Sequence, residues 1–338
     1  MEKKDKIKGC LFAGAIGDAM GYKIEFCSWD KIKLLYGENG IQKLPLISGE
    51  AIFSDDTQMT LFTCEGILNS KKNNTDLIWS IHQAYLNWLK TQGIVRKKFL
   101  FSQHKEVEVL PETESELCKI PKLNVQRAPG NTCISALYSG RMGTLKFPIN
   151  DSKGCGGVMR TAPLGFLSSK SFLFGCETAA LTHGHQGGWL PAGMLSDIIW
   201  QIIHTDRNIQ EIIETALFQA ISLWDTPYVY MFLELIQKAI KLSNTDMPET
   251  DAIHSIGEGW TGDEALAIAI YSVLKHPDSV KDTILCAVNH KGDSDSTGAI
   301  AGNIIGAYLG FDSIPKEWTE KIELRDLLED ISERMSEL

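Results

Sequence analysis

The sequence predicts an all-α fold, built as one compact multi-helix bundle. Apolar residues recur at three- and four-residue spacing along most of the chain, which is the pattern of amphipathic helices. No segment shows convincing strand alternation, and no repeat of fixed period is present. At 338 residues, with 43% apolar and 22% charged residues, the chain is long enough to bury a substantial core. We therefore expect residues 1–338 to form a single domain.

The individual helices follow from this periodicity. Helices in globular proteins usually run for about 8 to 20 residues, and each of the periodic segments fits that length. An acidic and apolar stretch near the C-terminus, 316–337, predicts one or two closing helices. The other predicted helices are 6–22, 56–70, 76–90, 189–204, 209–224, 229–242, 263–276, 279–290 and 297–310.

Glycine is frequent in the first of these helices and in the one that starts at residue 297. Glycine inside a helix costs about 1 kcal/mol relative to alanine, so its repeated use needs a reason. Small residues at four-residue spacing let two helix backbones approach closely, and we expect them to serve helix packing rather than chemistry. These residues are Gly14, Gly17, Gly21, Gly298, Gly302 and Gly306.

Residues 91–129 predict a long connection with little apolar periodicity. The segment carries a basic patch at 96–98, an acidic patch at 106–116 and three prolines. Connections of this length are usually functional lids or mobile segments. We expect a loop or lid insertion here.

Composition excludes several classes of partner. The formal net charge of −10 argues against a nucleic acid held by phosphate contacts, which needs a basic surface. No apolar run is long enough to span a membrane, and the N-terminus does not resemble a signal peptide. None of the eight cysteines forms a C-x-x-C pair. We expect a reduced cytoplasmic protein.

Two acidic clusters stand immediately before predicted helices. Alone, each could simply cap a helix, because Ser and Asp are favoured N-caps and acids suit the first turn. A cap needs one side chain, however, and each cluster supplies two aspartates and a hydroxyl. Gathered together, four carboxylates repel one another unless a cation neutralises them, and oxygen ligands suit hard ions such as Mg²⁺, Mn²⁺ or Ca²⁺. The clusters are Ser54, Asp55 and Asp56, and Asp293, Asp295 and Ser296.

A calcium-binding EF-hand loop is excluded for the second cluster. With Asp293 as position 1, Asp295 is position 3 and Gly298 is position 6, which partly fits. Position 12 is Ile304, where that loop requires a bidentate glutamate.

Seven motifs in order resemble the ADP-ribosylglycohydrolase family, whose bacterial prototype is dinitrogenase reductase-activating glycohydrolase. They span nearly the whole chain. The motifs are GCLFAGAIGDAMGYKIEF (9–26), SDDTQMT (54–60), RAPGNTC (127–133), GCGGVMRTAPLG (154–165), THGH (182–185), GEGWTGDEALAIA (257–269) and GDSDSTGAIAGNIIGA (292–307).

The resemblance implies a compact orthogonal helical bundle with a centre of two divalent cations, Mg²⁺ or Mn²⁺, between the two acidic clusters. The metal ligands carried over are the six cluster residues named above. Ser54 and Ser296 stand where the family often has threonine. Both residue types supply a neutral hydroxyl oxygen, so the expected effect on metal affinity is modest.

The resemblance also assigns further site residues. Glu25 matches a glutamate near the metals, and Asp55, Asp56 and Glu25 are the candidates for proton transfer, with their roles not separated. Outside the family context, Glu25 reads as a surface acid, Asn131 as an N-cap and His183 as a structural histidine. Glycines would let backbone N–H groups approach a diphosphate. The residues implied to bind substrate are Asn131, Gly154, Gly156, Gly157, Val158, Met159, Arg160 and His183.

The implied reaction is hydrolysis of the bond between C1″ of ADP-ribose and an acceptor. The expected acceptor is arginine on a modified protein, in reversal of mono-ADP-ribosylation or in toxin immunity. ADP-ribosyl-serine, O-acetyl-ADP-ribose and another ribosyl small molecule are alternative substrates. A non-catalytic ADP-ribose-binding protein is the alternative of another class.

Overall fold

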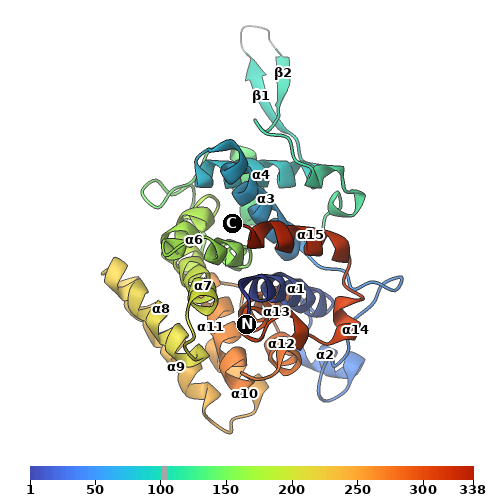
Figure 1. Ribbon diagram of the computed structural model, residues 1–338, viewed down its shortest axis with the longest axis vertical. Helices are drawn as coiled ribbons and strands as arrows, with labels where there is room; N and C mark the ends of the chain where they lie inside the picture. The colour runs from blue at the N-terminus through green and yellow to red at the C-terminus, as the bar shows by residue number, and fades with distance from the viewer. Residues whose placement is uncertain (101–104) are drawn as a thin grey trace.

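A computed structural model of the chain describes residues 1–100 and 105–338, and helices dominate it (Figure 1). None of the helices described is both long and apolar enough to cross a lipid bilayer. The α-helices are α1 Lys3–Tyr22, α2 Trp29–Tyr36, α3 Asp55–Asn73, α4 Leu77–Thr91, α5 Asn131–Ser139, α6 Ser171–Ala180, α7 Gln186–His204, α8 Ile209–Leu223, α9 Pro227–Ser243, α10 Glu249–Ile256, α11 Gly262–Lys275, α12 Val280–Val288, α13 Ser294–Leu309, α14 Lys316–Thr319 and α15 Arg325–Ser336.

Short 3₁₀ helices and one strand pair complete the described structure. Two of the 3₁₀ helices, η2 and η3, lie in the long connection between α4 and α5, two, η4 and η5, lie between α5 and α6, and η6 lies between α13 and α14. The remaining elements are η2 Leu117–Lys119, η3 Pro121–Leu123, η4 Cys155–Gly157, η5 Ala162–Phe166, η6 Phe311–Ser313, β1 Arg96–Leu100 and β2 Lys105–Val109.

The all-α prediction is confirmed, and each predicted helix is present close to its expected bounds. The segment 316–337 forms two helices, α14 and α15. Four helices were not predicted: α2, α5, α6 and α10. All four are short, of 8 to 10 residues, so each offers few turns over which a period can be recognised.

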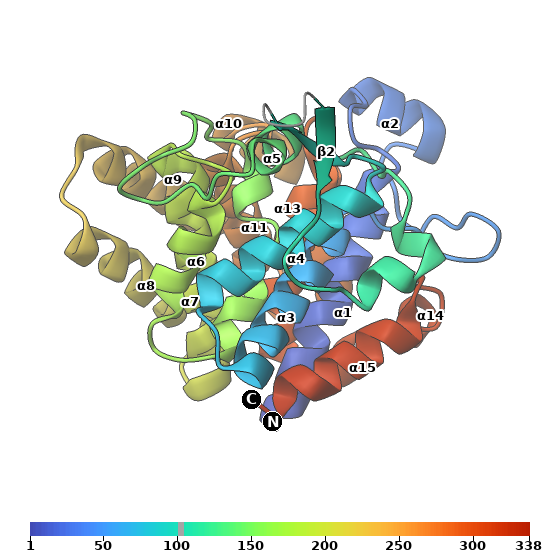
Figure 2. The ribbon, with the colours of Figure 1, turned by 90° about the horizontal axis from the view of Figure 1, so that it is seen from above.

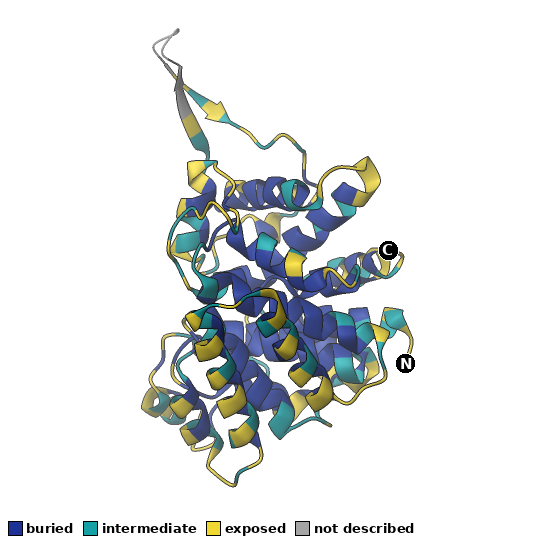
Figure 3. Ribbon diagram, turned by 90° about the vertical axis from the view of Figure 1, so that its left-hand side faces the viewer, coloured by how far each residue is buried: buried dark blue, intermediate teal, exposed yellow. Residues whose placement is uncertain are grey.

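The absence of strands was predicted wrongly for one segment. β1 and β2 pair antiparallel, with Arg96 opposite Val109 and Leu100 opposite Lys105. The Lys97 ammonium lies 3.7 Å from the Glu106 carboxylate across the pair. The hairpin projects from the helical body beyond α4 (Figures 1 and 3). The loop or lid expected within 91–129 therefore includes this strand pair and the 3₁₀ helices η2 and η3, and residues 101–104 lie outside the described residues.

The centre of the molecule is the packing of α1 against α13 (Figure 2). Both helices are buried along most of their length, while the helices around them expose their outer faces (Figure 3). A Cβ atom at Gly17 would lie 2.0 Å from the carbonyl oxygen of Gly298, and one at Gly302 would lie 2.1 Å from that of Ala13. These contacts are with backbone, which cannot move aside. The glycines therefore serve close helix packing, as predicted.

Candidate metal centre and active site

The first acidic cluster stands where α3 begins. Ser54 is the N-cap residue, and its hydroxyl accepts a hydrogen bond from the Asp56 N–H at 3.2 Å. Asp18 of α1 braces this turn: its carboxylate accepts hydrogen bonds from the Ser54 N–H at 2.7 Å and the Thr57 N–H at 2.9 Å. Because Ser54 and Asp18 serve these donors, the carboxylates of Asp55 and Asp56 are not required as caps.

The second acidic cluster begins α13. Asp293 is the N-cap residue, and one of its oxygens accepts from the Ser296 N–H at 3.4 Å. Asp295 accepts from the same N–H at 3.0 Å. The Cys155 thiol donates to the other Asp293 oxygen at 2.6 Å. The second cluster therefore does begin a helix, as one interpretation predicted. Capping, however, uses only some of the carboxylate oxygens.

The two clusters meet in one cavity. Carboxylate oxygens of Glu25, Asp293 and Asp295 lie within 4.8 Å of one another. Asp55 and Asp56 line the same cavity, which has a volume of about 340 Å³. α1 packs on α13 and, through Asp18, also holds the start of α3, so the starts of α3 and α13 lie together beside Glu25 at the end of α1. Among the lining residues that the structure describes, none is a lysine or arginine.

This concentration of negative charge shifts the titration of the site. Burial, followed by the charges of Asp295, Asp293 and Asp55, raises the pKa of Glu25 to about 10. Burial and the charge of Asp295 raise the pKa of Asp55 and of Asp56 well above the usual range. The same two causes raise the pKa of Asp293. Each carboxyl group thus resists ionisation unless positive charge is supplied.

The donor set fits divalent cations. One oxygen of Asp56, Oδ2, is buried and has no hydrogen-bond partner among the described residues. A buried carboxylate oxygen without a partner is costly, and a cation is its natural ligand. The cavity presents carboxylates and the hydroxyl-bearing Ser296, which match the oxygen ligands of Mg²⁺ or Mn²⁺. Ser54 is fully buried and does not line the cavity.

The glycine-rich loop forms another wall of the cavity. Gly154 makes a bridge with Thr261, and the Cys155 N–H donates to the Trp260 carbonyl at 3.2 Å, which ties the loop to the start of α11. A Cβ at Gly156 would lie 3.0 Å from the Cys133 sulfur, so the loop sits tightly against its neighbours. Of the predicted substrate-binding residues, those that line the cavity are Asn131, Gly154, Gly156, Met159 and His183.

Three predicted substrate-binding residues lie elsewhere: Gly157, Val158 and Arg160 do not line the cavity. Arg160 is fully buried, with its guanidinium over the Tyr85 ring at 4.3 Å and hydrogen-bonded to the Thr182 hydroxyl at 2.6 Å. It therefore supports the wall from behind. Burial, and then this neighbouring positive charge, lowers the pKa of His183 to about 3, so the imidazole at the cavity is neutral.

Several residues that shape the site were not predicted. Asp18 left a signal in the sequence, since it is a lone carboxylate in an apolar, glycine-rich helix. Phe26 and Trp260 stack at the cavity, with ring centroids 5.3 Å apart and planes 20° apart, and Phe26 is 70% exposed. Asn131, whose alternative was an N-cap, is the first residue of α5 and makes no capping hydrogen bond.

Fold and site together define a helical protein that gathers buried carboxylates from several helix ends into one polar cavity. The model of the ADP-ribosylglycohydrolase family matches residues 1–338, and the chain belongs to that family. The predicted family and fold are thereby confirmed.

Similar proteins cover the whole chain. An uncharacterized protein of Archaeoglobus fulgidus is 24% identical over 99% of this chain and 97% of its own length. ADP-ribosylarginine hydrolase Tri1 of Serratia proteamaculans is 25% identical over 99% of this chain and 80% of its own. A solved structure described as an ADP-ribosylglycohydrolase-related protein complex superposes with a TM-score of 0.67 at 19% identity, covering 99% of this chain and 98% of the other. That likeness shows the fold alone.

Proposed function

We propose that the protein is a Mg²⁺- or Mn²⁺-dependent hydrolase that releases ADP-ribose from ADP-ribosylated arginine. The observation that carries the proposal is the convergence of Glu25, Asp55, Asp56, Asp293 and Asp295 on one cavity without a lysine or arginine among its described lining residues. The full-length similarity to an enzyme described as an ADP-ribosylarginine hydrolase supports arginine as the acceptor.

The acidic residues would hold two divalent cations. Asp55 and Asp56 at the start of α3, together with Asp293, Asp295 and Ser296 at the start of α13, supply the oxygen ligands, and Ser54 is retained as a sixth candidate. Bound cations would neutralise the carboxylates and polarise oxygen atoms of water and ribose. Bracing of the α3 start by Asp18 would hold its ligands in place.

The remaining lining residues would bind the substrate. Gly154 and Gly156 let the loop backbone approach phosphate oxygens, which favours the diphosphate at this wall. Neutral His183 would offer a hydrogen bond without adding charge. The exposed face of Phe26, stacked on Trp260, offers a planar group a surface at the cavity. Asn131 also lines the cavity and would contribute a polar contact.

Hydrolysis would break the bond between C1″ and the arginine nitrogen. Water adds its oxygen to C1″, one water proton passes to a carboxylate of the site, and a proton reaches the departing guanidine. Glu25 is the least buried of the five carboxyl groups and so the best placed to exchange that proton with solvent; Asp55 and Asp56 are the other candidates. The carboxylates would also stabilise positive charge that develops on the ribose ring.

The proposal is tested by incubating the protein with Mg²⁺ and substrates of defined linkage, and measuring released ADP-ribose by mass spectrometry. Arginine-linked ADP-ribose should be cleaved, with serine-linked ADP-ribose and O-acetyl-ADP-ribose as comparisons. Tight binding of ADP-ribose without release from any of them would identify a binding protein instead.

Two substitutions test the metal centre. Asp56→Ala and Asp295→Ala should each abolish turnover, because each removes a carboxylate from a different side of the cavity. Circular dichroism should show the wild-type helix content in both variants. Full activity in either one, or in protein stripped of metal by EDTA, would contradict a two-metal mechanism.

A further inference from the structure

A second cluster of metal-binding side chains lies in a different cavity. Glu249, His276 and Cys286 each place a ligand atom within 4.8 Å of the others. The cavity they line has a volume of about 430 Å³ and shares no lining residue with the acidic cavity. Nothing in the proposed glycohydrolase chemistry uses these three residues.

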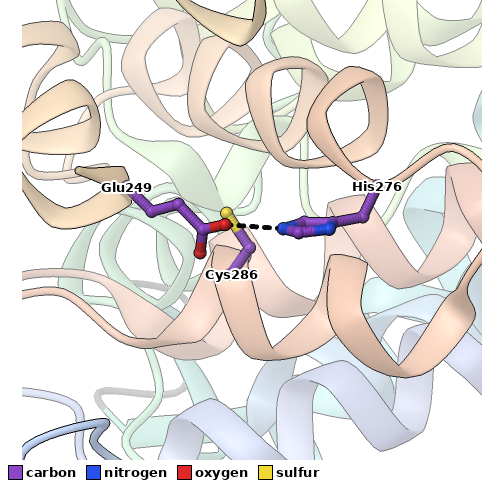
Figure 4. Close-up of side chains that lie close together, drawn as sticks. All are labelled: Glu249, His276 and Cys286. Atoms are coloured by element: carbon purple, nitrogen blue, oxygen red, sulfur yellow. Dashed lines mark hydrogen bonds and ion pairs between the residues drawn. The ribbon is translucent and has the colours of Figure 1, made fainter. Parts of the chain in front are cut away.

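The three side chains come from three helices or their ends (Figure 4). Glu249 is the first residue of α10, His276 caps the end of α11, and Cys286 lies within α12. A Glu249 oxygen lies 2.7 Å from Nε2 of His276. Figure 4 shows the carboxylate oxygen of Glu249 next to the sulfur of Cys286, with the imidazole of His276 facing both.

The chemistry of the set selects the ion. Cysteine sulfur and histidine nitrogen with one carboxylate are ligands of zinc, whereas Mg²⁺ prefers oxygen alone. A thiolate and a carboxylate carry two negative charges, which one divalent ion balances. The nearest lysine in sequence, Lys275, donates its ammonium to the Thr245 carbonyl at 2.7 Å and so is engaged elsewhere.

A separate observation also marks this place. The hydroxyl of Tyr271 is buried and has no hydrogen-bond partner among the described residues. Tyr271 lies on α11, five residues before His276. The helix that ends at one of the three ligands therefore carries an unsatisfied polar group as well.

We propose that Glu249, His276 and Cys286 form a zinc site, separate from the acidic centre, that joins α10 to α11 and α12. Binding replaces the thiol proton of Cys286 by the metal and releases that proton to solvent. Three protein ligands leave one position of a tetrahedral ion for water or a small ligand from the cavity. Because α12 leads into α13 through a short connection, a metal bound at this site would also help to hold the start of α13, where the second acidic cluster lies.

The test uses the full chain in excess Mg²⁺, which keeps hard oxygen sites filled, and adds Co²⁺ as a zinc probe. A thiolate bound to Co²⁺ gives a sulfur-to-metal charge-transfer absorption in the near ultraviolet. Wild-type protein should show this band, lose it on addition of Zn²⁺, and bind one equivalent of Zn²⁺ by calorimetry with an increase in melting temperature.

Two variants make the assignment specific. Cys286→Ser should abolish the band and weaken Zn²⁺ binding by on the order of a hundredfold or more, since loss even of an outer-sphere partner costs about 10- to 100-fold. Cys155→Ser is the matched control, because that thiol also lies beside a carboxylate, Asp293 at 2.6 Å; its band should be unchanged.

A third variant guards against misfolding. If circular dichroism shows that Cys286→Ser does not fold, His276→Gln replaces a less buried ligand and keeps the thiol. It should weaken Zn²⁺ binding at least tenfold and alter the band. A wild-type protein without the band, or equal Zn²⁺ affinity in His276→Gln, would overturn the site and leave Glu249 and His276 as an ordinary ion pair.

Discussion

At the scale of single residues, Asp56 shows how strongly the acidic centre depends on its counter-charge. Its Oδ2 atom is buried without a partner, and four other carboxyl groups line the same cavity. Folding without metal must either bury a charge on this group or hold it protonated, and both cost folding free energy; a bound cation reverses the effect.

Asp56→Asn should therefore affect stability oppositely with and without metal. In EDTA at neutral pH the variant should melt at a higher temperature than the wild type, because asparagine removes a carboxyl group that the metal-free fold must keep protonated at a pH where the unfolded chain ionises it. In Mg²⁺ the wild type should be stabilised and the variant much less. Thermal unfolding followed by circular dichroism measures both. Identical responses to Mg²⁺ would show that Asp56 is not a ligand.

His82 gives a second prediction at this scale, concerning pH. It is buried, both ring nitrogens are without hydrogen-bond partners among the described residues, and burial followed by the charge of Arg96 lowers its pKa to about 4. Between pH 6.5 and 4 the unfolded chain therefore takes up a proton that the folded chain refuses. Stability falls as pH drops through this window, by at most ~3 kcal/mol from this one residue.

His82→Leu should make that decline shallower and leave stability at pH 7 unchanged or higher. Urea unfolding between pH 4 and 8 measures the effect. The control is His204→Gln, at an exposed position at the end of α7, which should keep the wild-type slope. A slope unchanged by His82→Leu would rule out the contribution assigned to this histidine.

The sequence predicts the ligand side chains better than their supports. Asp55, Asp56, Asp293 and Asp295 stand in short motifs, whereas Asp18 acts through hydrogen bonds to backbone N–H groups of another segment. Such a role depends on which backbone lies opposite, and this is decided by helix packing. For the same reason the motif around Arg160 did not reveal that its guanidinium points behind the cavity wall.

At the scale of elements, helix length decides what the sequence can predict. Helices such as α3, α7 and α9 run for 17 to 19 residues and show clear periodicity. The strand pair escaped prediction because each strand has five residues and β1 carries basic residues without alternation. Its partner strand, β2, alternates Glu and Val, but over too few residues to distinguish a strand from a loop.

The packing of α1 on α13 yields the prediction at this scale. Alanine favours a helix over glycine by about 1 kcal/mol. At Gly17, however, the new Cβ would lie 2.0 Å from the Gly298 carbonyl oxygen, and separating the two backbones outweighs that gain. Gly17→Ala should lower stability by about 1 to 3 kcal/mol and weaken Mg²⁺ binding, because Glu25 follows the end of α1 and Asp293 stands at the start of α13.

Gly130→Ala is the matched control for stability. It has a φ of −60°, and the nearest atom to its Cβ is the Cys133 sulfur at 4.0 Å, so alanine fits without strain. Urea unfolding compares the two variants. A Gly17→Ala protein as stable as the control would show that the helices can separate without cost.

At the scale of the whole molecule, the hairpin is a separable appendage. Cavity-lining residues begin at Ala128 on this connection, and none of the described residues of 91–127 is among them. Arg96 anchors the hairpin base through a hydrogen bond from its Nε to the Tyr138 carbonyl at 3.3 Å. Whether the insertion acts as a lid thus stays a prediction that a deletion can test.

Residues 98–107 can be replaced by Asn-Gly, which joins the paired residues Lys97 and Glu108 through a tight turn. The melting temperature and the hydrolysis of free ADP-ribosyl-arginine should be unchanged, because the body and the cavity keep their residues. If the hairpin contacts the protein substrate, hydrolysis of a modified protein should fall while hydrolysis of free ADP-ribosyl-arginine does not. Loss of activity on the small substrate would instead show that the hairpin covers the cavity.

Local sequence patterns could not predict that the two acidic clusters lie side by side in space. Periodicity and spacing describe neighbours along the chain, whereas this site joins the end of α1, the start of α3 and the start of α13. The proposed metal-binding role was suggested only by the family resemblance, and the convergence of the carboxyl groups in the structure supports it.

The contact between α1 and α13 also constrains the order in which parts of the chain can fold during synthesis. The Asn303 amide donates to the Cys10 carbonyl at 2.9 Å, across 293 residues of sequence. The ribosome therefore releases α1 long before it synthesises α13. Until then the glycine face of α1 lacks the helix that covers it, while the helices between them are made. Contacts of such separation form slowly, and chains that wait for them need protection from aggregation. The acidic centre would be completed only once α13 has been synthesised, so a shorter nascent chain could acquire neither metal nor activity.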